Sequence, residues 1–326
     1  MVAVAVSLSA CGGGSSSADL TVYSGQHLQT MTKLVADFKK RTGKDVQLRP
    51  GSESSLANQL LREGSASPAD VFVTENPPAM TAVERKGLLA PLAPAALAKT
   101  PSRFHPPQGD WVPVSARAAV LVYNPSKVKP ADLPQHLREL AGPKWRGKVA
   151  IAPGESDFHP LITALGKLEG QDAVKAWLKG LKSNGKVYDD SEAVVVAVNR
   201  GDVPVGLIDH YYWYRGREEI GASKMHSALH YFAPKDAGAL VDVAGAGVLK
   251  AAKHAKLAQQ FVDYLVSKPA QEIIAAGSSY EYPLGSGVTT KRDLKPFDQL
   301  RPPDVSVEDL GDGRDALRAL QDAGLL

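Results

Sequence analysis

The chain has 326 residues, 44% of them hydrophobic, and a formal net charge of +3. That length and apolar content are sufficient for two domains of ordinary size, each with its own core. The 38 Lys and Arg residues are scattered along the chain and nearly balanced by 35 Asp and Glu residues, so nothing indicates nucleic-acid binding. Cys11 is the single cysteine, which excludes an intrachain disulfide and any zinc site built from several cysteines.

The N-terminal segment resembles the end of a bacterial secretion signal. Residues 1–10 are mostly small and apolar, but they are too few to span a bilayer as a helix. Residues 8–11, LSAC, resemble a lipobox, in which the cysteine becomes lipidated, and a GGGSSS run with the composition of a flexible tether follows. We therefore predict that residues 1–18 are a signal remnant and tether. Lipid on Cys11 would hold the protein at the outer face of a membrane and be its only membrane contact.

Strands and helices alternate along the chain, which predicts an α/β fold with a largely parallel sheet. In the first half, the apolar patterns predict helices at 31–38 and 56–61, and strands at 20–23, 46–48, 70–74, 112–123 and 148–151. In the second half they predict helical structure at 161–181 and 256–266, and strands at 203–208, 229–232 and 240–243. The segment at 193–198 is a continuous apolar run, and a charged C-terminal segment from 302 ends in a short helix.

Four residues that can bind a metal follow the ends of predicted strands, where open α/β sheets bind their ligands. They are His27, Glu75, Tyr211 and Tyr212. One carboxylate and two phenolates would neutralise a trivalent cation, and a hard, highly charged ion such as Fe(III) favours anionic oxygen ligands. Adjacent residues of a strand face opposite sides, so both tyrosines can bind one metal only if the strand ends before them. Taken alone, the same residues also fit polar surface positions and an aromatic core or surface patch.

Five segments, in the same order along the chain, resemble the ferric-ion-binding proteins of bacterial ABC transporters. They are YSGQH at 23–27, SPADVFVTE at 67–75, PKWRGK at 143–148, YYWY at 211–214 and EYPL at 281–284. In that family, residues at the positions of His27, Glu75, Tyr211 and Tyr212 bind Fe(III). The resemblance runs from about residue 20 to the C-terminus. It implies an extracytoplasmic, monomeric binding protein that delivers Fe(III) to the permease of an ABC transporter.

The same resemblance implies the type II-like fold of periplasmic binding proteins, with a ligand in the cleft between two lobes. Two crossing hinge strands would connect the lobes, one near 112–119 and one near 228–232. The first lobe would then comprise 19–115 and 228–285, and the second 116–227 and 286–326. Iron could bridge both lobes only when they close, so binding would favour the closed state.

The sequence departs from many relatives where they hold a synergistic anion, such as phosphate or carbonate, beside the iron. In the loop after the strand at 148–151, Glu155 and Asp157 stand where phosphate-binding relatives have Ser and Ala. Asp209 replaces an Asn, so the site gains a third acid. Carboxylates would repel phosphate, so we expect carbonate, water, or a direct oxygen from Glu155 or Asp157. Other candidates for this part of the site are Asn76, Arg117, Ser156 and Ser191.

Three other functions fit parts of the sequence. The same fold could bind a different trivalent metal, a phosphonate or an organic cation. A surface lipoprotein without a transport role could use the aromatic run as an interaction patch. An enzyme could use Glu75 and His27 as acid and base, but the H-E-x-x-H, P-loop, G-x-S-x-G and strand-linked G-x-G-x-x-G motifs are missing, so we do not expect catalysis.

Overall fold

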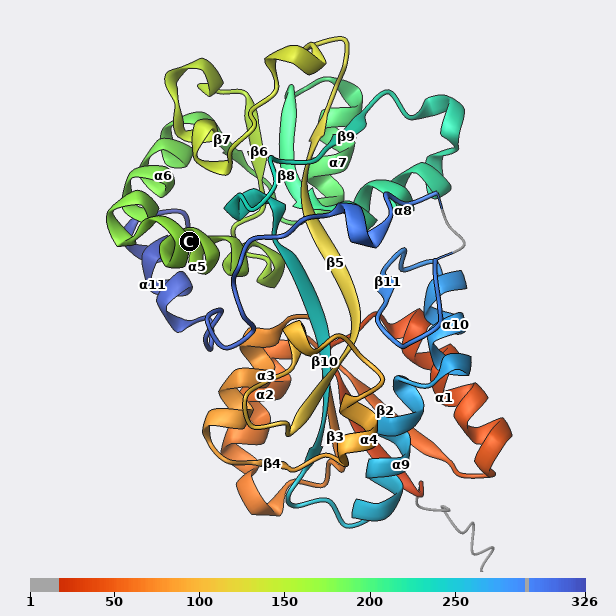
Figure 1. Ribbon diagram of the computed structural model, residues 1–326. Helices are drawn as coiled ribbons and strands as arrows, with labels where there is room; N and C mark the ends of the chain where they lie inside the picture. The colour runs from red at the N-terminus through yellow and green to blue at the C-terminus, as the bar shows by residue number, and fades with distance from the viewer. Residues whose placement is uncertain (1–17, 291–292) are drawn as a thin grey trace, which may run out of the picture.

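The computed structural model describes residues 18–290 and 293–326, which form two lobes that each contain a β-sheet (Figure 1). The hydrogen-bonded strand order is β2-β1-β3-β10-β5-β8-β6-β7. Strand β5 (Trp111–Tyr123) runs through both lobes, because residues 111–118 pair with β10 (Val241–Leu249) and residues 119–123 pair with β8 (Val205–Asp209). This confirms the predicted α/β architecture and places one continuous strand across the junction of the lobes.

The first lobe contains a mixed sheet. Strand β1 (Leu20–Ser24) pairs in parallel with β2 (Val46–Pro50) and β3 (Val71–Thr74), and β10 pairs antiparallel to β3. The short strands β4 (Leu89–Ala90) and β11 (Tyr282–Pro283) add to β10 and β5. All four residues of β3 are buried, as its continuous apolar run predicts. The helices of this lobe are α1 (Leu28–Thr42), α2 (Glu53–Glu63), α3 (Pro77–Arg85), α4 (Pro94–Leu97), α9 (Ala255–Leu265) and α10 (Lys268–Ala276).

The second lobe has a smaller sheet. Strand β6 (Val149–Ile151) pairs in parallel with β7 (Gly185–Val187) and β8, while β9 (Ala228–His230) pairs antiparallel to the end of β5. The C-terminal helix packs against the first two helices of this lobe (Figure 1). The helices are α5 (His159–Glu169), α6 (Gln171–Asn184), α7 (Ser191–Arg200), α8 (His210–Ile220) and α11 (Arg314–Asp322).

The pairing of β9 corrects the predicted return of the chain to the first lobe. Residues 228–230 pair with Leu121, Val122 and Tyr123, the part of β5 that also pairs with β8. The chain then runs back along β10, which pairs with β3 of the first lobe. The return near 228–232 was an implication of the family resemblance, and the three residues of β9 instead form a short strand beside the end of β5. We therefore move the proposed return from 228–232 to the start of β10.

One predicted helical region is divided in the structure, and one apolar run without a predicted secondary structure is a helix. The helical region at 161–181 is interrupted at Gly170, whose φ of 87° ends α5 before α6 begins. The apolar run at 193–198 lies within α7, whose N-cap Asp190 accepts a hydrogen bond from the Ala193 N–H. Gly201 ends this helix in the left-handed conformation, with φ of 79°. Both caps were visible in the sequence and would have identified the helix.

The apolar face of α1 anchors the helix that follows the first site residue. Met31, Leu34 and Phe38 are each about 1% exposed, and the Phe38 ring lies edge-on to Phe261 of α9 at 5.0 Å between centroids. Burial of each such side chain stabilises the fold by about 1.5–3 kcal/mol. The start of α1 is therefore held firmly against the sheet.

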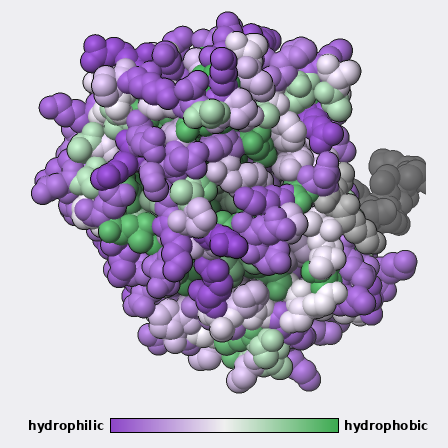
Figure 2. Space-filling model, turned by 45° about the horizontal axis from the view of Figure 1, so that its top comes forward, coloured by the Kyte–Doolittle hydropathy of each residue, from purple (hydrophilic) through white to green (hydrophobic). Residues whose placement is uncertain are grey.

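The outer surface is mainly polar. The face in Figure 2 is mostly hydrophilic, with hydrophobic residues in small separate patches. In the described ranges, 18–290 and 293–326, no helix has the length and apolar character needed to cross a bilayer. The predicted lipidation residue, Cys11, lies outside the described residues.

Candidate metal centre

The ends of three strands bring the four predicted metal ligands together. His27 precedes α1 just after β1, Glu75 follows β3, and Tyr211 and Tyr212 lie in the first turn of α8. Strand β8 ends at Asp209, so the tyrosines are helical and their rings lie side by side, 4.1 Å apart between centroids. The condition for two adjacent tyrosines to share one metal is therefore met.

The phenol oxygens converge on carboxylates from both lobes. Tyr211 Oη lies 3.1 Å from Glu75 Oε1 and 2.9 Å from Asp157 Oδ2. Tyr212 Oη lies 2.9 Å from the same Asp157 oxygen and 3.2 Å from Glu155 Oε2. Asp157 is therefore the centre of a compact oxygen cluster, in which each phenol can donate one proton to a carboxylate. The acids that the sequence places in this loop face the site, not the solvent.

His27 contributes a nitrogen at the edge of this cluster. Its Nε2 lies 3.2 Å from Glu75 Oε1 but makes no hydrogen bond, and its ring lies edge-on to Tyr211 at 5.0 Å. Burial lowers the pKa of His27, which favours the neutral ring that binds metals. An unpaired, buried imidazole nitrogen beside carboxylate and phenol oxygens fits a metal ligand.

Burial also keeps protons on the oxygen ligands. It is the main cause that raises the pKa of Glu75, Tyr211 and Tyr212 well above the ordinary values, and the Asp157 carboxylate raises all three further. A bound hard cation would balance the negative charge of the deprotonated side chains, and their protons would be released to solvent. In the described part of the chain, no group of three or more His, Cys, Asp or Glu residues is arranged to hold a metal ion.

A buried carboxylate that the sequence analysis missed positions the loop of Glu75. Glu53, at the start of α2, accepts hydrogen bonds from the backbone N–H groups of Glu75 and Asn76, at 2.7 and 2.8 Å. Its other oxygen accepts from Asn76 Nδ2 at 3.0 Å. Asn76 also donates to Asp157 Oδ1 at 2.8 Å, which links the two lobes. Glu53 therefore holds the loop within the first lobe, and the side-chain amide of Asn76 connects the loop to the second lobe.

Gly25 leaves the space that Glu53 occupies. A Cβ at position 25 would lie 2.6 Å from the Glu53 Cβ and 2.9 Å from its Cα. We expect Gly25→Ala to destabilise the protein by about 1–3 kcal/mol, because the backbone of α2 has to move. Denaturant unfolding measures this change. Gly154→Ala is the control, since its added Cβ would meet no atom closer than 4.0 Å, and equal stability of the two variants would contradict the steric argument.

Arg117, a candidate for the part of the site where relatives hold an anion, is a buried cation on β5. It donates to the Glu75 carbonyl oxygen and, at 3.1 Å, to Asn76 Oδ1. Its guanidinium pairs with Glu281 Oε1 at 2.5 Å, and both side chains are fully buried. Glu281 also accepts from Ser115 Oγ at 2.9 Å and from Gln26 Nε2 at 3.2 Å. Arg117 is thus already paired and supports the backbone that carries Glu75.

The remaining candidates border the cluster. The Ser191 N–H donates to Glu155 Oε2 at 3.1 Å, and Ser156 Oγ lies 3.4 Å from Asn76 Nδ2. Asp209 is buried at the N-cap of α8, where burial and then Asp157 raise its pKa well above the ordinary value. Ser191, Asp157 and Asp209 line one small cavity. All seven additional candidates therefore lie in or next to the centre, but only Glu155 and Asp157 contact the phenol oxygens.

A family profile matches most of the chain. Residues 66–304 match the bacterial extracellular solute-binding proteins. The chain belongs to this family. Among relatives of this solute-binding protein, the Fe(3+)-binding periplasmic protein of Serratia marcescens is 40% identical over 319 residues, which cover 97% of this chain and 94% of the relative. The major ferric iron-binding protein of Neisseria meningitidis serogroup B is 36% identical, covering 94% and 93%.

Solved structures show the same fold. Iron-bound HitA from Pseudomonas aeruginosa matches this solute-binding protein with a TM-score of 0.89 at 40% identity, covering 94% of this chain and 99% of that one. A Trichodesmium protein in complex with iron and citrate, named IdiA or FutA, matches with a TM-score of 0.83 at 30% identity and covers 94% and 99%. These matches confirm the family resemblance and the two-lobed α/β fold that the sequence predicted.

Proposed function

We propose that this protein is the extracytoplasmic binding component of an ABC transporter, which binds Fe(III) and delivers it to a membrane permease. The observation that carries the proposal is the convergence of both phenol oxygens on one Asp157 oxygen, with Glu75 and His27 at the same cluster. The names of the Serratia and Neisseria relatives and the iron-bound HitA structure support the choice of metal. This role is binding and transport, not catalysis.

The donor set suits a trivalent hard cation and requires both lobes. His27 and Glu75 come from the first lobe, and Tyr211 and Tyr212 from the second. Fe(III) would bind the two phenolates and the Glu75 carboxylate, whose three negative charges balance its own, while the neutral imidazole adds no charge. Because the ligands meet only when the lobes are together, metal binding would stabilise the closed arrangement.

A visible absorption titration tests this proposal. Metal-stripped protein is titrated with Fe(III) nitrilotriacetate, and we expect a tyrosinate-to-iron charge-transfer band that saturates at one equivalent. Iron should also raise the thermal unfolding temperature, because a ligand that binds only the native state stabilises it. A titration without a band, with iron that is removed by gel filtration, would reject Fe(III) as the cargo.

We further propose that Asp157 supplies the oxygen that an external anion supplies in other relatives. One of its oxygens lies 2.9 Å from each phenol oxygen, and Asn76 holds the other at 2.8 Å. A bound phosphate would meet the negative charges of both Asp157 and Glu155, which disfavour it. Water would fill any position that remains at the metal.

The variant Asp157→Asn separates these possibilities. Loss of a residue that only supports a metal ligand lowers metal affinity by roughly 10–100-fold. We expect Asp157→Asn to lower Fe(III) affinity by at least this much, because the proposal makes Asp157 a direct ligand. Added carbonate should shift the charge-transfer band of the variant and leave that of the wild type unchanged. Asp172→Asn, at a fully exposed position, controls for the change in charge. A wild-type band that shifts with added carbonate or phosphate would show that an external anion completes the site.

We also propose that a lipid on Cys11 anchors the protein to the outer face of a membrane. The proposal rests on the LSAC segment and the Gly/Ser run that follows it. In cells that express the full gene, Cys11→Ala should move the protein from the membrane fraction to the soluble extracytoplasmic fraction. Retention of the variant in the membrane fraction would contradict the anchor.

A further inference from the structure

His210 is a fully buried side chain next to the proposed metal ligands, and the ligand set does not include it. It is the first residue of α8 and directly precedes Tyr211 and Tyr212. Both of its ring nitrogens bond to backbone atoms that are distant in the sequence, Ala118 on β5 and Tyr280 in the loop between α10 and β11. The helical turn that carries the tyrosines is therefore attached to two other elements through this ring.

The first bond fills a gap in the strand pairing of β5. On the edge of β5 opposite to β10, β11 pairs with residues 115–116 and β8 pairs with residues 119–123. The Ala118 N–H lies between these two pairings and donates to His210 Nδ1 at 3.1 Å. A buried backbone N–H without a partner costs free energy, so the His210 ring serves as its acceptor in place of a strand.

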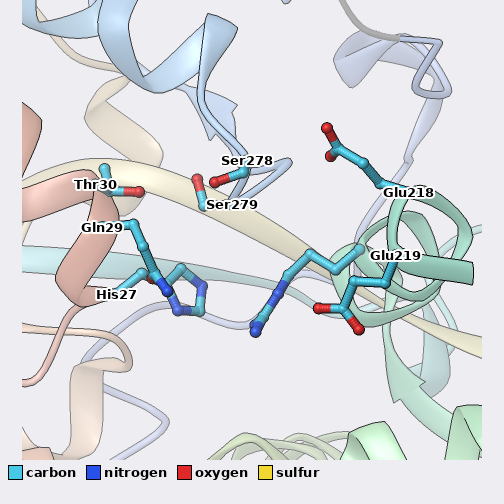
Figure 3. A pocket seen from close by; sticks show the side chains of 8 residues that line it. His27, Gln29, Thr30, Glu218, Glu219, Ser278 and Ser279 are labelled. Carbon is cyan, nitrogen blue, oxygen red and sulfur yellow. The ribbon is translucent and has the colours of Figure 1, made fainter.

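The second bond connects the same ring to the first lobe. Because His210 Nδ1 accepts from an N–H, the neutral ring carries its hydrogen on Nε2, which donates to the Tyr280 carbonyl oxygen at 2.9 Å. The Tyr280 loop lies next to α8, since residues 278–279 and 218–219 line the same pocket (Figure 3). His210 therefore bridges the strand that joins the lobes and a loop of the first lobe, in one defined tautomer.

Tyr280 contacts three residues along one face of α8. His210, Tyr214 and Glu218 are four residues apart, so they lie in a row on the helix. The Tyr280 ring stacks on Tyr214 with 5.4 Å between centroids, and its hydroxyl donates to Glu218 at 2.6 Å. Its backbone has a φ of 55°, which is uncommon for a residue with a side chain. This face of α8 is therefore attached to the first lobe at its start, and His210 makes the contact nearest to the tyrosines.

The same two segments also support a proposed metal ligand of the first lobe. Arg117 donates to the Glu75 carbonyl oxygen and pairs with Glu281. Arg117 directly precedes one backbone partner of His210, and Glu281 directly follows the other. One pair of segments therefore holds the ligand loop of the first lobe through Arg117 and the tyrosine-bearing turn of the second lobe through His210.

We propose that His210 is a positioning residue for metal binding, which fixes the first turn of α8, and with it both phenol oxygens, relative to Glu75. In this role His210 supports the ligands without binding the metal itself. Without the two bonds the turn is free to rotate, and the phenol oxygens lose their alignment with the carboxylates. The inference rests on the proposed function for the identity of the metal, but the bridge is a property of the metal-free protein.

Three variants at position 210 test the inference. His210→Phe keeps an aromatic ring against Tyr282, which stacks on His210 at 4.8 Å, but removes both hydrogen bonds. Asparagine has an oxygen near the position of Nδ1 and glutamine a nitrogen near that of Nε2, so His210→Asn and His210→Gln can each restore one bond. Fe(III) affinity is measured by competition with a chelator, together with the wavelength of the charge-transfer band. We expect His210→Phe to lower the affinity by about tenfold or more and to shift the band, with the other two variants between it and the wild type.

His230→Phe is the matched control. His230 Nε2 donates to the Pro134 carbonyl oxygen at 2.8 Å, so the variant removes the same kind of bond on β9, outside the proposed metal centre. It should keep the wild-type band and affinity. A packing role for His210 predicts the opposite order, with His210→Phe closest to the wild type. That order, or an equal loss in the control, would overturn the inference. If His210→Phe does not fold, wild-type affinity in both His210→Asn and His210→Gln would overturn it.

A second measurement needs neither iron nor a variant. Nitrogen NMR of the metal-free protein at neutral pH should show a hydrogen on Nε2 of His210 and none on Nδ1, and the Ala118 amide should be protected from hydrogen exchange. A hydrogen on Nδ1 would exclude the bridge and overturn the inference. A missing charge-transfer band in the wild type rejects the Fe(III) proposal instead and leaves the NMR result unaffected, so the two ideas fail separately.

Discussion

Replacing both Tyr211 and Tyr212 with phenylalanine is expected to abolish the charge-transfer band and to weaken Fe(III) binding strongly. The two phenol oxygens lie within hydrogen-bond distance of the carboxylates of Asp157, Glu75 and Glu155, and their loss removes two of the three charges that would balance Fe(III). Removal of a residue that only supports a metal ligand lowers metal affinity by roughly 10–100-fold, and the loss of Fe(III) affinity in the double variant should exceed this. Visible titration, with competition by a chelator of known affinity, measures both effects.

The rings are retained in this double variant, so its fold should persist. Tyr211 is fully buried, and phenylalanine preserves its ring contacts with the neighbouring residue 212 and with His27. Tyr214→Phe is the matched control, because it makes the same chemical change in the same helix, on a ring that stacks on Tyr280 instead. A full-strength band in the double variant, or loss of the band in the control, would place the metal elsewhere.

The positions of the proposed metal ligands in the fold follow from their places at strand ends. A parallel sheet brings the carboxyl ends of its strands to one edge, so residues 27 and 75, which follow the parallel strands β1 and β3, could be expected to meet without knowledge of the loops. Residue 211 follows β8 in the sheet of the other lobe, so only the family resemblance implied that it joins them. The start of α8 could not be derived from the YYWY run itself, which has neither a strand nor a helix period. Strand β8 ends at Asp209, which occupies the N-cap position of α8 without a side-chain cap, and the tyrosines fall in the first helical turn.

The residues that support these ligands could not be found from local sequence. Glu53 holds the Glu75 loop from 22 residues away, and Glu281 pairs with Arg117 across 164 residues. Neither of these separations along the sequence corresponds to a helix or strand period. The segment EYPL at 281–284 carried part of the family resemblance, but no chemical role followed from it until the buried Arg117 was seen beside it. Such pairs are fixed by tertiary packing, which single-sequence patterns do not contain.

The Arg117–Glu281 pair leads to the largest expected change in stability. Both side chains are fully buried, with 2.5 Å between Arg117 Nη2 and Glu281 Oε1. Glu281→Ala would leave the buried guanidinium without its main partner, and removal of one member of a buried pair costs about 3–5 kcal/mol. We expect a loss of this size in the free energy of unfolding, measured by denaturant titration at pH 7. Glu272→Ala, whose exposed ion pair with Lys268 contributes about 0–1 kcal/mol, is the control.

The pH dependence of this loss provides a second test. Burial alone would raise the pKa of Glu281, but Arg117, His27 and the hydrogen bond from Ser115 together outweigh it and hold the pKa below the ordinary value of 4.5. The folded state therefore favours the ionised carboxylate, so its contribution is complete above pH 4.5 and disappears as the pH falls through the lowered pKa. The difference between wild type and Glu281→Ala should shrink in acid. A constant difference would mean that the cost arises from the cavity left by the side chain, and that Glu75 and Asn76 are sufficient partners for Arg117.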